Sequence, residues 1–188
     1  MTDAQLTSAG TARYRHADEA TLIVWAKAGD QAAFTALAEG AQRRLLAVCH
    51  RSCRDSGDAA DACQDALLAA WQNLGSFRGE SGFATWLCAI GLNACRAIQR
   101  KRRPVPQEIE DDSVTQEDPT VRVDLRDAVA RALEELDEPV RSAIVLREYG
   151  GLSYDEIAHA LGAELNTVRT RIHRGRRRLA ELLLEEAS

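Results

Sequence analysis

Apolar residues in the first half of the chain recur at intervals of three and four, the spacing of one face of an α-helix. This pattern predicts a helical domain over residues 18–103, with breaks at the pair Gly57-Asp58 and at residues 75–82. Asp30 is a suitable N-cap for the first long helix. The residues expected to face inward are Phe34, Leu37, Ala41, Leu45, Val48 and Ser52, then Cys63, Leu67, Ala70 and Leu74, then Phe83, Leu87, Ile90, Ala94 and Ile98.

The middle of the chain interrupts the pattern. Residues 104–120 contain three of the four prolines and few apolar side chains, a composition that predicts a flexible acidic linker. Helical spacing resumes over residues 121–186, whereas residues 1–17 are aperiodic and predict a disordered tail. No segment alternates as a strand would. The sequence therefore predicts an all-α fold, with two small helical domains joined by the linker.

The second domain begins with simple amphipathic helices. Val129, Leu133 and Leu136 form one apolar stripe, and Pro139 is placed to open the next helix. That helix is expected to bury Val140, Ile144 and Val145.

Two further helices of this domain are marked by their capping residues. Ser153 and Glu156 have the spacing of a capping box, and Gly162 occupies the position of a left-handed C-cap. Asn166 is then expected to cap a helix that runs from Thr167 to about residue 184. Residues expected to pack the two helices across the turn are Ile157, Ala158, Leu161, Val168 and Ile172. This layout predicts a helix-turn-helix.

The last predicted helix carries a concentration of cationic and polar side chains near its start. A helix fits the major groove of DNA, where arginine contacts guanine edges and phosphates. The alternative is a basic helix that faces only water. We expect DNA contacts, including a guanine contact from Arg171 or Arg174, because the basic face and the helix-turn-helix occur together. The predicted contact residues are Asn166, Thr167, Arg169, Thr170, Arg171, His173, Arg174, Arg176 and Arg177.

The charge distribution is consistent with DNA binding even though the net charge is −5. Basic side chains gather at residues 100–103 and 169–178, and an acidic stretch at residues 108–118 lies between them. Segregated charges of this kind indicate separate surfaces with separate partners.

The first domain offers two further candidate surfaces. On its second helix, a polar stripe with one leucine suits either water or a partner helix. On its third helix, Trp86 shares a face with Ala89 and several polar residues, and tryptophan and arginine can hold an unpaired base and its phosphates. Trp86 is equally compatible with a core position. The stripe comprises Asp61, Gln64, Asp65 and Leu68; the other set comprises the loop residues Phe77, Arg78, Gly79, Glu80 and Ser81 with Trp86, Asn93, Arg96 and Arg100.

The five cysteines leave two interpretations open. There is no C-x-x-C pair, and the odd count with no export signal argues against a disulfide framework. Cys49, His50 and Cys53, with Cys63 nearby, allow the hypothesis of a metal or redox switch. Free cysteines are more often small buried hydrophobes.

The remaining composition excludes several classes of protein. No apolar run approaches the ~20 residues of a membrane span, and no secretory signal is present, so we expect a cytoplasmic protein without membrane insertion. No phosphate loop, nucleophile elbow or structural metal spacing occurs. We therefore expect neither an enzyme nor a bound cofactor.

Taken together, the motifs resemble the extracytoplasmic-function (ECF) sigma factors of the sigma-70 family. Residues 28–34 are similar to the opening of their domain two, and residues 61–65 with Trp71 to their polymerase-binding segment. Residues 77–81 with Thr85, Trp86, Leu87, Ile90 and Asn93 are similar to the segment that melts and reads the −10 element. Residues 146–148, 151–158 and 167–171 are similar to domain four, which reads the −35 element. The resemblance extends from about residue 22 to 184, and four motifs in the family's order make it specific.

The resemblance implies roles for these residues and identifies partners. Residues 18–103 would be sigma region 2, in which Asp61, Gln64, Asp65 and Leu68 bind core RNA polymerase. The loop and the Trp86 face would melt and read the −10 element as single-stranded non-template DNA. Residues 121–186 would be sigma region 4, which reads duplex DNA at −35. An anti-sigma factor would be a further partner. The alternatives are a conventional helix-turn-helix regulator and a sigma-like interaction protein that does not initiate transcription.

Overall fold

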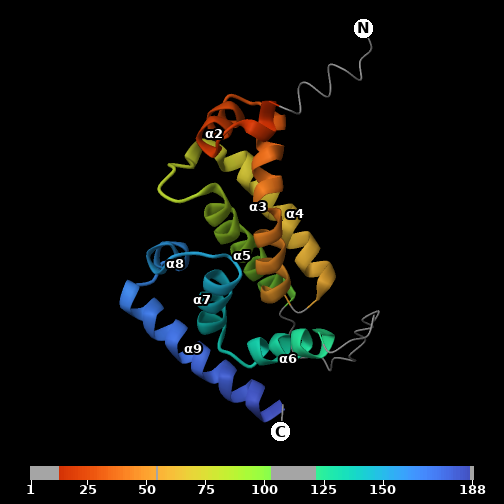
Figure 1. The fold of residues 1–188 in the computed structure, drawn as a ribbon, viewed down its shortest axis with the longest axis vertical. Helices are drawn as coiled ribbons and strands as arrows, with labels where there is room; N and C mark the ends of the chain where they lie inside the picture. Colours follow the sequence, from red (N-terminus) through yellow and green to blue (C-terminus); the bar gives the residue numbers. More distant parts are fainter. Residues whose placement is uncertain (1–12, 54, 103–121, 187–188) are drawn as a thin grey trace.

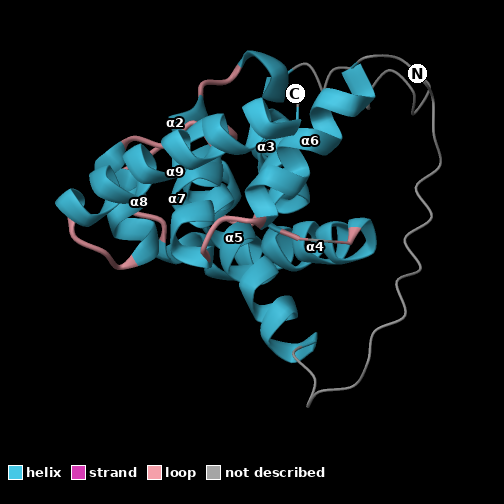
Figure 2. Ribbon diagram, turned by 90° about the horizontal axis from the view of Figure 1, so that it is seen from below, coloured by secondary structure: helices cyan, strands magenta, loops and turns pink. Residues whose placement is uncertain are grey.

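The computed structural model describes residues 13–53, 55–102 and 122–186, and every regular element in these ranges is a helix (Figures 1 and 2). The first domain contains α2 (Glu19–Lys27), α3 (Gln31–Ser52), α4 (Ser56–Asn73), a 3-10 turn (Leu74–Ser76) and α5 (Phe83–Arg102). The second contains α6 (Arg122–Glu134), α7 (Glu138–Glu148), α8 (Tyr154–Leu161) and α9 (Leu165–Glu186). The predicted all-α fold with two helical units is confirmed. The predicted linker, residues 104–120, lies outside the described residues.

Aspartate residues cap the N-termini of α2, α3 and α4. The side chain of Asp30 accepts hydrogen bonds from the backbone N–H groups of Ala32 and Ala33 at 3.0 and 3.1 Å, as its position predicts. Asp55 accepts from the N–H of Asp58 at 2.9 Å, so α4 starts just before the expected break at Gly57. Each cap satisfies backbone donors that the first helical turn leaves unpaired.

The end of the predicted tail is part of the folded domain. Residues 13–16 are helical, and the Tyr14 ring meets the Trp25 ring edge to face at 6.0 Å. The Tyr14 hydroxyl donates to Asp30 at 3.0 Å, and the Arg13 guanidinium lies 4.1 Å from the centre of the Trp25 ring. The prediction of disorder was wrong for these residues because it considered only helical periodicity, and these contacts are non-local. Residues 1–12 lie outside the described part.

The core of the first domain lies between α3, α4 and α5. Most of the expected inward residues of α3 and α4 are buried, with Phe34 and Leu67 half-buried. Gly91 explains how closely α5 approaches α3. A Cβ at this position would lie 2.5 Å from Leu45 Cδ1 and 3.3 Å from Cys49 Sγ.

The buried face of α5 is wider than the sequence pattern predicts. Ile90, Ala94 and Ile98 were expected to face inward but are only half-buried. Cys88, Leu92 and Cys95 are instead almost fully buried. The reason is that α5 packs on two sides, against its own domain and against the second one.

A second buried cluster spans the two domains. Val48, Cys88 and Leu92 of the first domain belong to the same buried cluster as Ala143 and Ile144 of α7. Figure 1 shows α7 lying beside α5, with α9 along the outer edge of the second domain. Arg51 of α3 also lies over the Tyr149 ring, 5.4 Å from its centre. We call this contact between α3, α5 and α7 the domain junction.

The second domain is packed mostly as its sequence predicts, although Val129 of the predicted stripe is only half-buried. Leu133, Leu136, Val140, Ile144 and Val145 are all buried. Pro139 lies in the first turn of α7, where its missing N–H costs nothing. Within the described ranges, none of the helices combines the length and apolar content that crossing a membrane requires.

Gly175 allows α9 to pack closely on α7. A Cβ at this position would lie 2.6 Å from Ile144 Cγ1 and 2.9 Å from Val140 Cγ1. We therefore expect Gly175→Ala to lower the free energy of unfolding, because overpacking typically costs about 1–3 kcal/mol and exceeds the helix propensity that alanine adds. Gly40→Ala in α3 is the matched control, since nothing lies within 4 Å of its added Cβ. Urea unfolding of both variants tests this, and equal or higher stability of Gly175→Ala would contradict the packing.

Candidate nucleic-acid interface

The helix-turn-helix is built by the predicted capping residues. The backbone N–H of Ser153 donates to the Glu156 carboxylate at 2.7 Å, and the N–H of Glu156 donates to Ser153 Oγ at 3.2 Å. Gly162 ends α8 with φ 58°, in the left-handed region that favours glycine. Ile157, Val168 and Ile172 are buried across the turn, while Ala158 and Leu161 are half-buried. The predicted motif is confirmed.

Asn166 does not cap α9 as predicted. The helix begins at Leu165, so Asn166 already lies within its first turn. Its side-chain oxygen accepts a hydrogen bond from Arg169 at 3.0 Å, and its backbone oxygen accepts one from Thr170 Oγ1 at 2.9 Å. The earlier start follows from the short turn after Gly162, which brings Glu164 into position for its carbonyl to accept from the N–H of Val168.

The outer face of α9 carries most of the predicted DNA-contacting residues. Val168, Ile172 and Gly175 are buried against the domain, and the opposite side is exposed. Thr167 and Arg171 are half-buried, which places them closer to the packed side. The exposed members of the predicted set are Asn166, Arg169, Thr170, His173, Arg174, Arg176 and Arg177.

Several of these arginines form surface ion pairs with acids of the same domain. Arg176 lies 2.6 Å from Glu148, whose hydrogen bond and negative charge raise the pKa of Arg176. Arg174 lies 3.4 Å from Asp137, and Arg177 lies 3.5 Å from Glu181. Exposed pairs of this kind contribute little stability, so a DNA phosphate can replace the carboxylate at low cost.

The predicted polymerase-binding stripe is exposed along α4. Asp61, Gln64 and Asp65 face outward, and Leu68 among them is 56% exposed. The buried face of α4 is formed by other residues, including Ala62 and Ala66. A single exposed leucine is common on protein surfaces, so the exposure of Leu68 is compatible with either water or a protein partner.

The predicted melting loop differs from expectation at its aromatic residue. Phe77 is buried, and its ring packs against Phe83 and Trp86 with centres 6.2 and 5.0 Å away. Lys27 Nζ donates to the Phe77 carbonyl at 2.6 Å and holds the start of the loop. Phe77 is therefore a support of the loop in this structure, and its ring is not available to stack on a base.

The rest of the loop remains accessible. Arg78, Gly79 and Glu80 are exposed and Ser81 is half-buried. Gly79 has φ +74°, a conformation that lets the chain reverse there without strain. Arg78 and Glu80 form only a long ion pair of 3.9 Å.

The Trp86 face of α5 is only partly free. Trp86 is half-buried in an aromatic cluster with Phe77 and Phe83. The sequence left open a core position or an exposed stacking surface for Trp86, and its half-buried ring has part of each. Asn93 and Arg100 are exposed.

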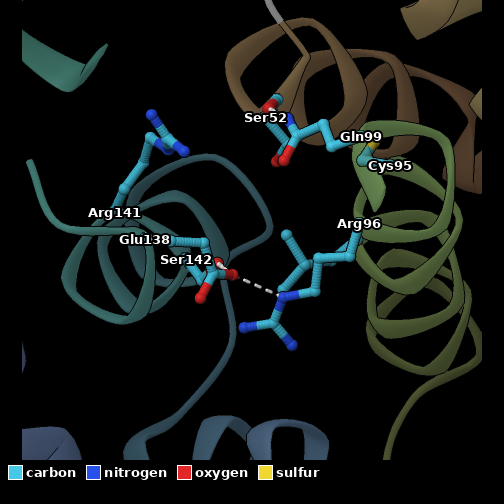
Figure 3. A pocket seen from close by; sticks show the side chains of 8 residues that line it. Ser52, Cys95, Arg96, Gln99, Glu138, Arg141 and Ser142 are labelled. Carbon is cyan, nitrogen blue, oxygen red and sulfur yellow. Dashed lines mark hydrogen bonds and ion pairs between the residues drawn. The ribbon is translucent and has the colours of Figure 1, made fainter. Parts of the chain in front are cut away.

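Arg96 points into the domain junction. Arg96 Nε lies 2.6 Å from Glu138 Oε1, and Ser142 Oγ donates to the same oxygen at 2.9 Å (Figure 3). Nearby, Gln99 donates to the Ser52 carbonyl. Sequence reasoning missed Glu138 and Ser142 because the pair joins separate domains, and neither helical periodicity nor spacing reports such a contact.

The fold is that of a two-domain helix-turn-helix protein with an exposed basic face, and comparisons with known proteins give its family. Models of sigma-70 region 2 and sigma-70 region 4 match residues 37–104 and 126–179. The RNA polymerase sigma-H factor of Pseudomonas aeruginosa is 33% identical over 177 residues, which cover 86% of this chain and 92% of that protein. The ECF RNA polymerase sigma-E factor of Escherichia coli K12 is 35% identical over 170 residues, which cover 82% and 88%.

Solved structures agree with this family. CnrH in complex with the cytosolic domain of CnrY superposes with a TM-score of 0.70 at 32% identity, covering 90% of this chain and 99% of that chain. The sigma factor RpoE in complex with the anti-sigma factor NepR from Bartonella quintana gives a TM-score of 0.62 at 26% identity, covering 78% and 93%. The chain belongs to the sigma-70 family, in its ECF group, and its function is promoter recognition as a sigma factor.

The ion pair at the junction predicts a pH dependence. Burial opposes ionisation of Glu138, but hydrogen bonds from Ser142 and Arg96 outweigh it and hold the pKa of Glu138 below its usual 4.5. Such a carboxylate stabilises the fold above its unfolded pKa and loses this contribution as pH falls through the lowered value. We expect Glu138→Gln to be less stable than the native chain at neutral pH, and the difference to shrink below pH 4.5. Urea midpoints across this range test it, and a difference independent of pH would contradict the role of the charge.

Proposed function

We propose that this sigma factor reads the −35 element through the outer face of α9. The proposal rests on the exposure of this outer face. The helix α9 belongs to a capped helix-turn-helix, and its opposite side is buried in the domain. Arg169, Thr170 and His173 lie near the start of the helix, where side chains reach base edges in the major groove. Arg176 and Arg177 lie further along it, where phosphate contacts would orient the domain.

The exposed stripe of α4 is proposed to bind core RNA polymerase. Asp61, Gln64 and Asp65 supply hydrogen-bond acceptors and charge, and the exposed Leu68 supplies an apolar anchor. This role assigns no bond-making chemistry to the chain, since synthesis of RNA belongs to the polymerase. It also places the protein in the cytoplasm, where polymerase and promoter DNA are found.

The loop after Phe77 and the outer side of α5 are proposed to hold the unpaired −10 strand. Arg78 and Ser81 lie on the loop, and Asn93 and Arg100 lie on α5. Glu138 occupies Nε of Arg96, and the Arg96 side chain is only 24% exposed, so the full set of guanidinium donors becomes available to a phosphate when the pair separates. Full engagement of promoter DNA therefore requires the domain junction to open.

An anti-sigma factor is proposed as a further partner. CnrH was solved with the cytosolic domain of CnrY, and RpoE with the anti-sigma factor NepR. A protein that bound this chain while its domains are closed would favour the state in which Arg96 is occupied.

Transcription from purified components tests the polymerase contact. Asp61→Ala is expected to abolish or strongly reduce a specific transcript made with core RNA polymerase and a DNA library, because it removes a charge from the docking stripe. Glu39→Ala is the matched control, since Glu39 is an exposed acid on α3 outside every proposed surface.

Two outcomes would contradict the proposal. Tight binding to polymerase without any transcript would favour a sigma-like interaction protein. Binding of DNA without binding of polymerase would favour a conventional regulator.

Promoter affinity tests the role of α9. Arg174→Ala is expected to weaken binding to the −35 element by about 1–3 kcal/mol, the usual value of a bidentate guanine contact. Arg178→Ala is the control, because Arg178 lies on the same helix and pairs with Glu181, outside the proposed set. Equal effects of both changes on every promoter variant would show a general charge effect and remove Arg174 from base reading.

A further inference from the structure

Helix α2 contacts both ends of the loop that joins α4 to α5. At the start of the loop, Lys27 Nζ donates to the Phe77 carbonyl at 2.6 Å and lies 6.0 Å from the centre of the Phe77 ring. At its end, Glu19 Oε1 accepts a hydrogen bond from the backbone N–H of Phe83 at 3.0 Å. These partners are 50 and 64 residues apart in the sequence, so both contacts belong to the tertiary structure. Figure 1 shows this loop beginning beside α2.

The contact from Glu19 replaces a cap that the loop itself does not provide. Gly82 precedes α5, and its carbonyl accepts the first hydrogen bond of the helix from the N–H of Trp86 at 3.1 Å. A glycine has no side chain to accept from the unpaired N–H groups of the first turn. Glu19 supplies such an acceptor from α2 and places a negative charge at the positive end of α5. The start of α5, and with it the end of the loop, is therefore tied to α2.

Helix α2 is itself held in the first domain. Leu22 and Ala26 are 7% and 3% exposed and belong to the core of that domain, and Asp18 caps the N-terminus of the helix. Glu19 and Lys27 are the first and last residues of this nine-residue helix, so a rise of about 12 Å separates them. A buried helix of this length keeps the two anchors at a fixed separation.

The part of the loop between the anchors remains accessible. Residues 78–80 are exposed, and Ser81 is half-buried. The rings of Phe77 and Phe83 meet with centres 6.2 Å apart, whereas a chain of about six residues can extend to roughly 20 Å. The ends of the loop are therefore held close together, and its middle is presented to solvent.

We propose that Glu19 and Lys27 are positioning residues for the unpaired −10 strand, because they fix both ends of the loop that holds it. This inference rests on the proposed function of the loop. A loop that is already fixed at both ends loses less conformational freedom when DNA binds than a loose loop does. More of the interaction free energy is then available to hold the strand, and neither Glu19 nor Lys27 needs to touch DNA.

The charge of Glu19 makes the sign of the effect informative. Glu19→Ala removes a negative charge near a proposed DNA-binding loop, which by electrostatics alone would strengthen DNA binding. The same change removes the acceptor of the Phe83 N–H, so the proposal predicts weaker engagement instead. Glu19→Gln removes the same charge but keeps a side-chain oxygen that can accept this hydrogen bond. Glu39→Ala, which removes an exposed acid from α3, is the control for charge elsewhere in the first domain.

Amide hydrogen exchange of the full chain measures whether the anchor holds the loop. The Phe83 amide should exchange roughly tenfold faster in Glu19→Ala than in the native chain, because the start of α5 can then open locally. Glu19→Gln should keep the native rate. Amides in the middle of α4 should be unchanged in each variant, which shows that the domain stays folded. An unchanged Phe83 rate in Glu19→Ala would overturn the proposal.

Promoter opening by the holoenzyme measures the consequence for function. Each variant is combined with core RNA polymerase and the promoter recovered by transcription of the DNA library, with 2-aminopurine in the −10 region to report unpaired bases. Glu19→Ala should slow opening roughly tenfold, the cost of ordering about one more residue when the strand binds. Glu19→Gln and Glu39→Ala should not slow it. Opening at the native rate or faster in Glu19→Ala would show that the anchor has no such role.

Lys27→Met should slow opening to a similar extent, and its salt dependence separates positioning from direct contact. Removing a lysine that contacts a phosphate lowers the salt slope of binding by about one. The proposal predicts an unchanged slope, because Lys27 acts through the Phe77 carbonyl. A lowered slope would assign Lys27 to the DNA contacts and refute its role as an anchor.

Arg78→Ala separates failure of this inference from failure of the function on which it rests. Slower opening in Arg78→Ala with native opening in Glu19→Ala would keep the loop as a DNA contact and reject its positioning by α2. Native opening in both variants would reject the role of the loop in holding the strand, and this inference with it.

Discussion

The shared hydrophobic core between α7 and the paired helices α3 and α5 is the contact on which the arrangement of this molecule depends. Val48, Cys88 and Leu92 face Ala143 and Ile144 across the junction, and all five are almost completely buried. Burial of apolar surface contributes roughly 25 cal/mol per Å², and it needs no exact pairing of charges. The Arg96–Glu138 pair then fixes the alignment, with side chains that are 24% and 43% exposed. Apolar packing therefore supplies most of the attraction, and the ion pair supplies orientation.

This junction explains why the promoter-facing residues are unequally available. The outer face of α9 and the stripe of α4 lie away from the junction and are exposed, whereas Arg96 lies within it. A sigma factor held in this form can still present the surfaces proposed to bind the −35 element and polymerase. Contacts with polymerase and DNA that form only in the open state would shift the population toward that state. The size of the shift is limited by the difference in binding free energy between the open and closed states.

Local rules predicted much of the fold because the interactions involved are local. Asp30, Ser153, Glu156 and Gly162 act within one turn of their own helices, and a capping pattern is readable from spacing alone. Most of the buried positions of the second domain were predicted for the same reason, although Val129, Ala158 and Leu161 are only half-buried. Errors of one or two residues, as at the start of α9, reflect hydrogen bonds that spacing does not specify.

Contacts between distant segments could not be predicted in this way. Burial of Phe77 depends on Phe83 and Trp86, and the order of Tyr14 depends on Trp25 and Asp30. The pairing of Arg96 with Glu138 and the burial of Cys88 and Leu92 all follow from the second domain docking on α5. The family resemblance identified the segments that matter, but it did not reveal which side chains are covered in this closed arrangement.

The distance between the two domains tests this account most directly. Fluorescent labels can be attached through unnatural amino acids at Gln42 on α3 and Ala180 on α9, both of which are exposed and outside the junction. Single-molecule energy transfer should show one short distance in the free chain and a longer one when core polymerase and promoter DNA are bound. The same distance in both states, or a broad range of distances in the free chain, would contradict a closed arrangement that opens for promoter recognition.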